Sequence, residues 1–315
     1  MNKNQKIIIT GGAGFLGSHL VKCFIQEGYN KNNIFIPRTK DFDLRHENDI
    51  KRMFEQFPAE VVIHLAANVG GIGYNQKFPG SLFYDNLKMG TELIEQARKN
   101  NVKKFVSIGT VCAYPKHTKV PFKEKDLWKG YPEETNAPYG LAKKMQLVQA
   151  QAYRQQYGFN AIFLLPVNLY GPGDNFNPKS SHVIPALIRK VYLAKKNNKN
   201  SITVWGTGKA SREFLYVKNA AEGIFLAAKK YNKSKPVNLG SHMEITIKEL
   251  INLIADLMNY KGKINWDTSK PDGQPRRCLD TSRAEKEFGF KAKTDFEKGL
   301  KETIGWYVER ENKNL

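Results

Sequence analysis

The stretch TGGAGFLGSHL, residues 10–20, decides the fold that this sequence predicts. It follows the short apolar run KIIIT (6–10), which is typical of a buried strand, and it opens an amphipathic stretch typical of a helix. Glycine allows a tight turn and a close approach of the backbone to a ligand. The start of the helix adds free N–H groups and a partial positive charge. On a first strand–helix unit this pattern predicts a pyrophosphate-binding turn. Its residues are Gly11, Gly14, Phe15, Leu16 and Gly17.

Short apolar runs alternate with amphipathic stretches through the first half of the chain. The further predicted strands are IFIP (34–37), VVIHLAA (61–67), KFVSIG (104–109) and AIFLLPV (161–167). Such alternation predicts an α/β fold with a doubly wound parallel Rossmann sheet, here over residues 1–172. From residue 173 to 315 we expect a smaller, mixed α/β C-terminal region that binds substrate. Some of its elements, including residues 212–230, are expected to return to the sheet.

Composition narrows the class of protein. The chain has 315 residues, a net charge of +20 and three widely spaced cysteines without CxxC spacing. Neither a disulfide framework nor a metal site is predicted, and a reducing cytoplasm fits best. The N-terminus predicts no signal peptide, and no run is long enough for a membrane helix. Lysines are spread along the chain, so we expect an anionic small-molecule substrate rather than nucleic acid.

The end of the second predicted strand, IPRTKDFDL (36–44), indicates which dinucleotide binds. NAD-binding sheets usually place an acidic residue here for the ribose 2′-hydroxyl. Arg38 takes that position, and a guanidinium suits a 2′-phosphate by charge and geometry. The sequence therefore favours NADP(H). The alternative is that Arg38 is only a surface charge and that Asp41 or Asp43 reads the ribose.

Two pairs of residues carry the predicted chemistry. Tyr139 and Lys143 are four apart on an expected helix, so they share a face. A nearby cation lowers the pKa of a phenol, which predicts proton transfer between Tyr139 and a carbonyl oxygen. If the strand stays extended past Gly109, Thr110 and Cys112 point to the same side. Thr110 is then expected to hydrogen-bond the substrate oxygen, and Cys112 to remove a proton from a carbon beside the ketone.

The chain resembles the extended short-chain dehydrogenase/reductase family over nearly its whole length. The segments that carry the resemblance are NVGGIGYNQ (68–76), CAYPK (112–116), NAPYGLAK (136–143), NLYGPGDNF (168–176), SSHVIPALIRK (180–190), VWGTGKASREFLYV (204–217) and PDGQPRRCLD (271–280). Within the family, the first two segments and SSHVIPALIRK are specific to a branch that epimerises and reduces GDP-4-keto sugars. The resemblance implies a GDP-4-keto-6-deoxy-hexose substrate, with epimerisation at C3 and C5 and reduction at C4. A related GDP-ketosugar, such as a GDP-4-keto-heptose, is the alternative.

The resemblance also implies roles for individual residues. Tyr139 would protonate the C4 oxygen, Lys143 would hold the nicotinamide ribose, and Cys112 and His182 would serve epimerisation. The expected nucleotide-sugar contacts are Lys190, Trp205, Arg212, Asp272, Arg276 and Arg277. The remaining expected cofactor contacts are Arg38, Asp43, Ala66, Ala67, Ile108, Gly109, Pro166, Asn168, Leu169 and again Lys143 and His182.

Two departures from the family pattern stand out. Thr110 replaces the usual serine and adds a methyl group beside the sugar, which would suit a modified substrate. Lys218 and Asn219 replace an acidic pair, and there we expect a changed local contact without loss of chemistry.

Other functions are less well supported. A 4,6-dehydratase of this superfamily usually has an Asp-Glu pair where Val111 and Cys112 stand. A simple 4-epimerase has no need of Cys112 and His182. A dinucleotide sensor or a nucleic-acid-binding protein has no reason to keep the whole catalytic set. The resemblance also implies a homodimer, and the two helices expected at 81–100 and 138–158 are long enough to pair with their symmetry mates in a four-helix interface.

Overall fold

Six parallel strands form the main sheet of the computed structural model, which describes residues 1–270 and 272–313. The strands are β1 (Ile7–Thr10), β2 (Ile34–Phe35), β3 (Val61–His64), β4 (Lys104–Ile108), β5 (Ala161–Pro166) and β9 (Val237–Leu239). Their order is β2-β1-β3-β4-β5-β9, and every neighbouring pair is parallel. The chain starts at β1, turns outward to the edge strand β2 and then crosses back to add β3, β4, β5 and β9 on the other side, which confirms the predicted doubly wound fold.

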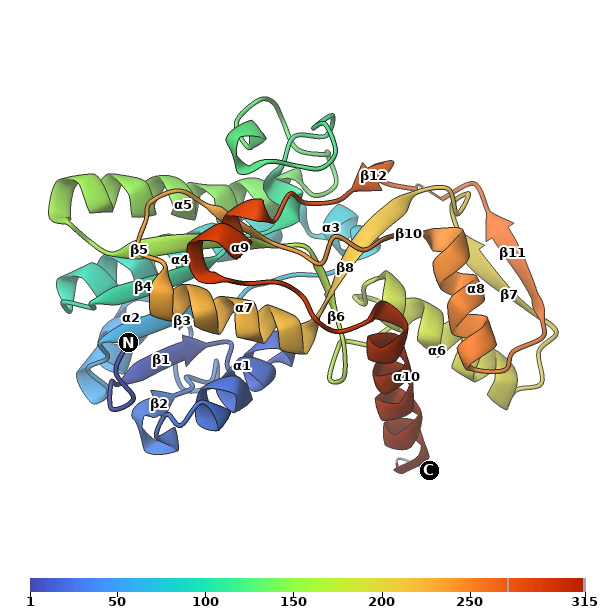
Figure 1. Ribbon diagram of the computed structural model, residues 1–315, viewed down its shortest axis with the longest axis horizontal. Coiled ribbons are helices and arrows are strands. Elements are labelled where there is room, and N and C mark those ends of the chain that lie inside the picture. Colours follow the sequence, from blue (N-terminus) through green and yellow to red (C-terminus); the bar gives the residue numbers. More distant parts are fainter. Residues whose placement is uncertain (271, 314–315) are drawn as a thin grey trace.

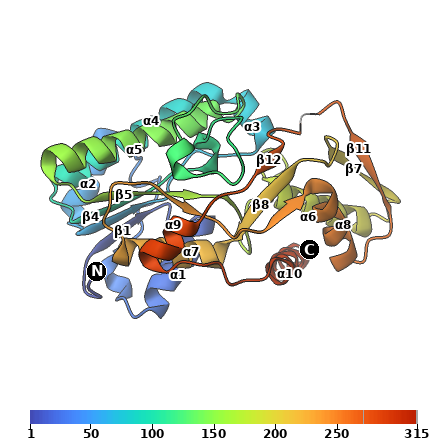
Figure 2. The same ribbon diagram turned by 45° about the horizontal axis from the view of Figure 1, so that its top comes forward.

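Helices cover both faces of this sheet (Figures 1 and 2). One face carries α1 (Phe15–Gln26) and α7 (Val217–Lys230), and the other carries α2 (Glu47–Gln56), α4 (Pro79–Lys99) and α5 (Ala137–Tyr157). Side chains alternate along a strand, so β1 serves both layers. Ile7 and Ile9 join the core under α1, whereas Ile8 joins the core under α2 and α4. This burial on both faces explains why the strands read as continuous apolar runs.

A second region beside the carboxyl end of the sheet contains two small sheets (Figure 1). The first sheet is built from β6 (Asn168–Tyr170), β8 (Ser211–Tyr216), β10 (Glu244–Thr246) and β12 (Arg276–Arg277), and the second from β7 (Ser201–Trp205) and β11 (Lys263–Asp267). The helices α6 (Val183–Lys196), α8 (Ile247–Leu257) and α10 (Phe296–Lys313) share a separate apolar core with them. The short helix α3 (Ile72–Lys77) precedes α4.

The chain passes between the two regions more than once. Residues 212–230 were expected to return to the main sheet, and the structure corrects this in part. Helix α7 packs beside α1, but β8 lies in a small sheet because it pairs with β6, β10 and β12. The strand that returns is β9, and α9 (Ser282–Phe288) packs against it. The functional division at residues 172 and 173 stays a prediction.

No helix among the described residues is long and apolar enough to cross a membrane.

Candidate active site

The glycine-rich turn between β1 and α1 opens the site at the carboxyl edge of the sheet. Gly11 has a φ of +69°, and a Cβ there would lie 2.8 Å from the backbone nitrogen of Ala66. A Cβ on Gly17 would lie 2.1 Å from the Gly11 oxygen, so helix and turn touch at this point. Gly14 is the N-cap of α1, and Phe15 and Leu16 are half-buried in its first turn. The result is a bare backbone cradle at a helix N-terminus, which fits a dinucleotide pyrophosphate.

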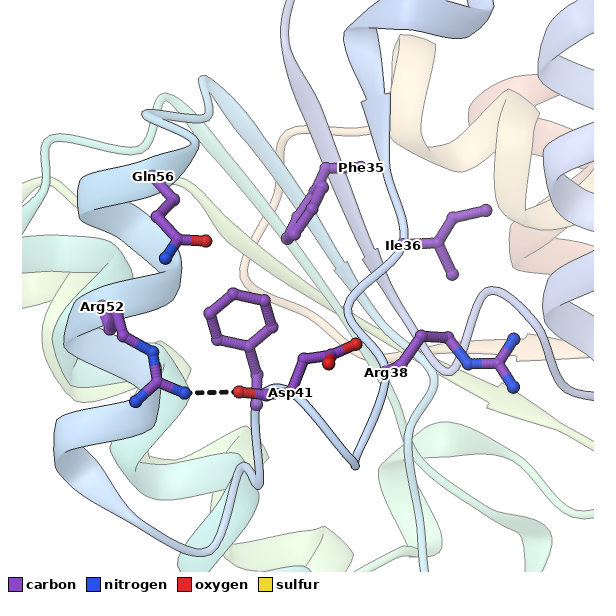
Figure 3. A pocket seen from close by; sticks show the side chains of 7 residues that line it. Phe35, Ile36, Arg38, Asp41, Arg52 and Gln56 are labelled. Carbon is purple, nitrogen blue, oxygen red and sulfur yellow. Dashed lines mark hydrogen bonds between the residues drawn. The ribbon is translucent and has the colours of Figure 1, made fainter.

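A pocket of about 410 Å³ lies where β2 ends (Figure 3). It is lined by Phe35, Ile36, Arg38, Asp41, Phe42, Arg52 and Gln56. Arg52 turns toward Asp41, whose backbone oxygen accepts its hydrogen bond, whereas the exposed Arg38 side chain extends away from both. Within residues 1–270 and 272–313, Arg38 has no ion-pair partner. Its guanidinium is therefore available to an anionic ligand.

The two acidic residues proposed as ribose readers lie in different surroundings. Asp43 is paired with Arg45 at 2.6 Å, and hydrogen bonds from that guanidinium lower the pKa of Asp43 to about 2. Asp41 lines the pocket with an exposed side chain. In the alternative, Asp43 would bind the ribose while paired with Arg45. The choice between Arg38 and these two aspartates stays a prediction.

The remaining expected cofactor residues follow the neighbouring strands. Thr10, His64 and Ser107 lie in register, so β1, β3 and β4 end at one edge. The residues just beyond are therefore neighbours in space: Ala66 and Ala67 after β3, Gly109 after Ile108, and Asn168 and Leu169 after Pro166. The Ala66 N–H donates to the Thr10 hydroxyl oxygen at 3.3 Å, and the Asn168 side chain donates to the Glu213 carbonyl at 3.0 Å.

Tyr139 and Lys143 lie in the first two turns of α5. Lys143 is only 2% exposed, and burial lowers its pKa to about 7. Tyr139 is half-buried, and its pKa is raised, first by desolvation and second by the neighbouring Cys112. The expected lowering of the phenol pKa is therefore wrong. The cause is desolvation, which disfavours the charged form of each of the two groups.

The turn at Thr110 differs from the predicted extended path. Residues Val111–Ala113 form a 3₁₀ helix, and the Thr110 side chain caps it by accepting a hydrogen bond from the Cys112 N–H at 3.1 Å. The alternation that was to place Thr110 and Cys112 on one side is therefore wrong. The cap uses an acceptor position of the hydroxyl and leaves its proton available to a substrate oxygen.

Two polar side chains from distant parts of the sequence contact the sulfur of Cys112. The Arg277 guanidinium donates to Sγ at 3.6 Å, and the thiol donates to Asn136 Oδ1 at 3.6 Å. Arg277 is only 7% exposed. The positive charge in contact with Cys112 therefore belongs to Arg277. Asn136 was missed as a site residue, although it begins the quoted segment NAPYGLAK.

His182 stands at the N-cap of α6, on a loop that contacts another segment specific to the branch. The Gly71 N–H donates to the Ser180 carbonyl at 3.1 Å, which joins residues 68–76 to residues 180–190. The His182 side chain remains accessible to water. Even so, the surrounding protein desolvates the imidazole and lowers its pKa, and the charge of Arg277 lowers it further. Arg277 therefore acts electrostatically on His182 and touches Cys112.

The expected substrate residues gather on the second region. Lys190 donates to the Thr203 carbonyl at 2.7 Å, next to the half-exposed Trp205. Arg212 donates to the Asp272 carbonyl at 3.0 Å, and the Asp272 carboxylate accepts two hydrogen bonds of 2.7 Å from Thr207. These contacts hold the loop that carries Asp272 over β8.

Arg276 and Arg277 point in different directions, as consecutive residues of a strand do. The Arg276 side chain is 60% exposed and pairs with Glu244 at 2.6 Å, whereas Arg277 is buried beside Cys112. A substrate role for Arg276 stays a prediction.

The departure at Lys218 and Asn219 gives local contacts with the C-terminal helix and the segment before it. Lys218 pairs with Glu302 at 2.9 Å, and the Asn219 side chain accepts from the Thr294 N–H at 3.1 Å.

In the part of the chain that the structure describes, no group of three or more His, Cys, Asp or Glu side chains is arranged to hold a metal ion.

A Rossmann sheet with a glycine turn after β1 and a Tyr139–Lys143 pair on α5 is the arrangement of an extended short-chain dehydrogenase/reductase. A model of the NAD dependent epimerase/dehydratase family matches residues 7–240. The chain belongs to this family. It is 40% identical to the probable GDP-L-fucose synthase 1 of Oryza sativa subsp. japonica, over 98% of this chain and 93% of that protein.

Solved structures show the same architecture. A GDP-6-OMe-4-keto-L-xylo-heptose reductase from C. jejuni superposes with a TM-score of 0.93 at 28% identity, covering 98% of this chain and 99% of that one. A GDP-L-fucose synthetase from Naegleria fowleri bound to NADP superposes with a TM-score of 0.88 at 30% identity, covering 99% and 96%. The predicted family and fold are thus confirmed.

Proposed function

We propose that this chain is an NADPH-dependent epimerase-reductase that converts GDP-4-keto-6-deoxy-D-mannose to GDP-L-fucose. The observation that carries the proposal is the contact of Cys112 with Arg277, in a site that also holds Tyr139 and His182. A reductase alone needs one acid beside the carbonyl. A thiol held against a cation, with a histidine acted on by the same cation, adds the means to exchange protons at carbon.

The cofactor is NADP(H), and the chain offers a site for each part of it. The cradle of Gly11, Gly14 and Gly17 takes the pyrophosphate, Arg38 takes the 2′-phosphate, and Lys143 takes the nicotinamide ribose. When bound, NADPH supplies the hydride for the C4 carbon. Residues 108–109 and 166–169, at and just beyond the ends of β4 and β5, would contact the nicotinamide half of the cofactor.

Tyr139 is the acid for reduction. Its raised pKa keeps the phenol protonated before substrate binds, so it can donate to the C4 oxygen as negative charge develops there. The free hydroxyl proton of Thr110 gives that oxygen a second hydrogen bond. Lys143 lies one turn away on the same helix, where binding of the cofactor's ribose hydroxyls satisfies its buried ammonium.

The same C4 ketone makes the C3 and C5 protons removable. Cys112 takes the proton as thiolate: the C–H bond breaks, an S–H bond forms, and the electron pair moves into an enolate at the C4 oxygen. Tyr139 and Thr110 hydrogen-bond the enolate oxygen. His182 returns a proton to the opposite face of the carbon, which inverts its configuration. Solvent then takes the proton from the thiol and returns one to the imidazole. Both side chains are thereby restored, and the epimerisation involves no change of oxidation state.

The diphosphate of the substrate is expected at Arg212 and Arg277, and the remainder of the GDP near Lys190 and Trp205. Arg212 and Arg277 stand opposite each other on β8 and β12. Two adjacent guanidiniums suit a diphosphate because each can form paired hydrogen bonds with phosphate oxygens. The net charge of +20 also attracts an anionic nucleotide sugar.

A GDP-4-keto-heptose is the second candidate substrate. It is favoured by the TM-score of 0.93 with the heptose reductase and by the Thr110 methyl group beside the sugar. The two candidates are separated by comparing kcat/KM for GDP-4-keto-6-deoxy-D-mannose and GDP-4-keto-heptoses, with NADPH oxidation as the readout. We expect the 6-deoxyhexose to be preferred. Preference for a heptose, or no turnover of the 6-deoxyhexose, would contradict the proposal.

Assembly and location are also proposals. The long helices α4 and α5 pack together and leave Phe83, Tyr84, Val148 and Tyr157 exposed, which favours a homodimer that pairs these helices. Cys23, Cys112 and Cys278 are free thiols, which suits a reducing cytoplasm. Light scattering on the purified chain tests the dimer. A monomer at micromolar concentration would contradict it.

A further inference from the structure

Asn136 has no place in the chemistry described so far, yet its side-chain oxygen accepts a hydrogen bond from the Cys112 thiol. It occupies the N-cap of α5, but its side chain makes no capping hydrogen bond to the helix. The side chain turns instead toward Cys112 and the buried groups around it. Asn136 therefore serves the thiol rather than the end of the helix.

The orientation of the Asn136 amide follows from its hydrogen bonds to Glu133 and Asn75. Its Nδ2 donates to the carboxylate of Glu133, which only accepts when ionised, and its Oδ1 accepts from Asn75 Nδ2 at 3.1 Å. Glu133 also accepts from the Thr135 hydroxyl at 2.7 Å. Asn75, Glu133 and Asn136 are all buried. An oxygen must therefore face Cys112, and an oxygen can bind the S–H but not a bare thiolate.

Arg277 meets the opposite requirement at the same sulfur. A guanidinium has donors only, so it binds a thiolate and gains nothing comparable from a thiol. Its position is set by Gln274, whose Oε1 accepts from Nε and Nη2 at 3.2 Å each. Gln274 in turn donates to the Lys116 carbonyl at 2.8 Å. Cys112 thus has one fixed partner for each protonation state.

We propose that Asn136 is a positioning residue for Cys112. Asn136 stabilises the protonated thiol of Cys112, and Arg277 stabilises its thiolate. This inference rests on the proposed function in that it explains how one thiol could take a proton from carbon and then release it. Because each protonation state of Cys112 has its own partner, neither the thiol nor the thiolate is stabilised so strongly that proton exchange with the substrate carbon stops. Asn75 and Glu133 keep the amide from rotating when the proton leaves.

Alkylation of the ligand-free enzyme by iodoacetamide tests the proposal without any substrate. The rate at Cys112 is followed by mass spectrometry at one neutral pH, and Cys23 and Cys278 serve as internal references. Burial raises the pKa of those two thiols to about 11 and about 12, so they react slowly. Asn136→Leu removes the acceptor at similar volume, and Cys112 should react about five-fold faster. Asn136→Asp adds a carboxylate beside the sulfur, and Cys112 should react at least about five-fold more slowly.

Arg277 variants give the matched comparison. Arg277→Met should slow alkylation of Cys112 at least about five-fold, and Arg277→Lys should restore most of the rate because it keeps the charge. Equal rates for Asn136→Leu and Asn136→Asp would overturn the proposal, because a merely steric role would not depend on charge. So would a slower reaction in Asn136→Leu. If Asn136→Leu does not fold, the Asp variant and the Arg277 pair still decide.

Turnover provides a second readout. In deuterated water, Asn136→Leu should lower kcat for deuterium exchange at C3 and C5 more than it lowers kcat for reduction, with KM for the GDP-sugar little changed. Equal losses in both steps would contradict a role through Cys112. A wild-type enzyme that turns over no GDP-ketosugar would overturn the proposed function, whereas the alkylation result would stand or fall independently.

Discussion

Arg277 on β12 lies directly opposite Arg212 on β8, in a parallel pairing of neighbouring strands. Desolvation, followed by the charge of Arg277, lowers the pKa of Arg212 to about 10. Two guanidiniums held together in this way repel each other while the site lacks a ligand. A bound diphosphate would neutralise the charges of both guanidiniums, so this pair favours binding of an anion.

Arg212→Ala should therefore raise KM for the GDP-sugar about ten-fold or more, since a hydrogen bond to a charged group is lost. The same change should raise the melting temperature of the ligand-free protein, because it removes a buried charge that faces a like charge. Steady-state kinetics and thermal unfolding check the two effects. Lys209→Ala, an exposed neighbour before β8, is the control and should change neither. An unchanged KM in Arg212→Ala would contradict the diphosphate assignment.

Tyr139→Phe should reduce NADPH oxidation by about 10²–10⁴-fold, because the variant cannot donate a proton to the C4 oxygen. NADPH binding, followed by its fluorescence, should be retained. Tyr157→Phe removes a hydroxyl from the exposed end of the same helix and should leave turnover unchanged. Turnover near the wild-type rate in Tyr139→Phe would exclude Tyr139 as the acid.

Lys143 predicts a specific pH dependence of stability. Its pKa in the folded protein, about 7, lies below that of an unfolded chain, about 10.4. Between these values the unfolded chain binds the extra proton, so the stability contributed by this site rises with pH. Lys143 therefore destabilises the ligand-free protein most below pH ~7.

Lys143→Met should accordingly raise the free energy of unfolding by something on the order of a few kcal/mol below pH ~7, and by progressively less toward pH ~10. The same variant should lose reduction and bind NADPH more weakly. Chemical unfolding across this pH range, on variant and wild type in parallel, measures the difference. A difference that does not change with pH would show that Lys143 is not a buried, deprotonating amine.

Arg38→Ala should raise KM for NADPH by about ten-fold or more while changing KM for NADH little, because only NADPH carries the 2′-phosphate. Lys31→Ala removes one positive charge from the residues just before β2, at the end of that strand away from Arg38, and should affect both cofactors equally. The ratio of the two KM values measures the effect. Equal losses for NADPH and NADH in Arg38→Ala would favour Asp41 or Asp43 as the ribose reader.

The sequence predicted what depends on local pattern. The glycines at 11, 14 and 17 and the apolar runs are properties of adjacent residues, and the strand–turn–helix unit they predict is present. The position of Tyr139 relative to Lys143 follows from helix geometry alone. These features require no knowledge of where distant segments pack.

The predictions from sequence were wrong or incomplete where a competing local hydrogen bond, burial, or contact with a distant segment determines the structure. The extended path at Thr110 was wrong because a threonine side chain can cap a turn, and here it accepts the Cys112 N–H. The lowered phenol pKa of Tyr139 was wrong because burial raises that pKa, and the charge of Cys112 raises it further. The contact of Arg277 with Cys112 spans 165 residues and depends on the pairing of β12 with β8, which no local pattern shows.

The measurement that tests the central claim most directly is turnover of GDP-4-keto-6-deoxy-D-mannose with NADPH in deuterated water, with the product read by NMR. The account predicts GDP-L-fucose with deuterium at C3 and C5. Cys112→Ser should lose that deuterium and keep some direct reduction of the ketone, whereas Cys23→Ser should behave as wild type. Reduction without deuterium at either carbon, or deuterium retained in Cys112→Ser, would contradict the account.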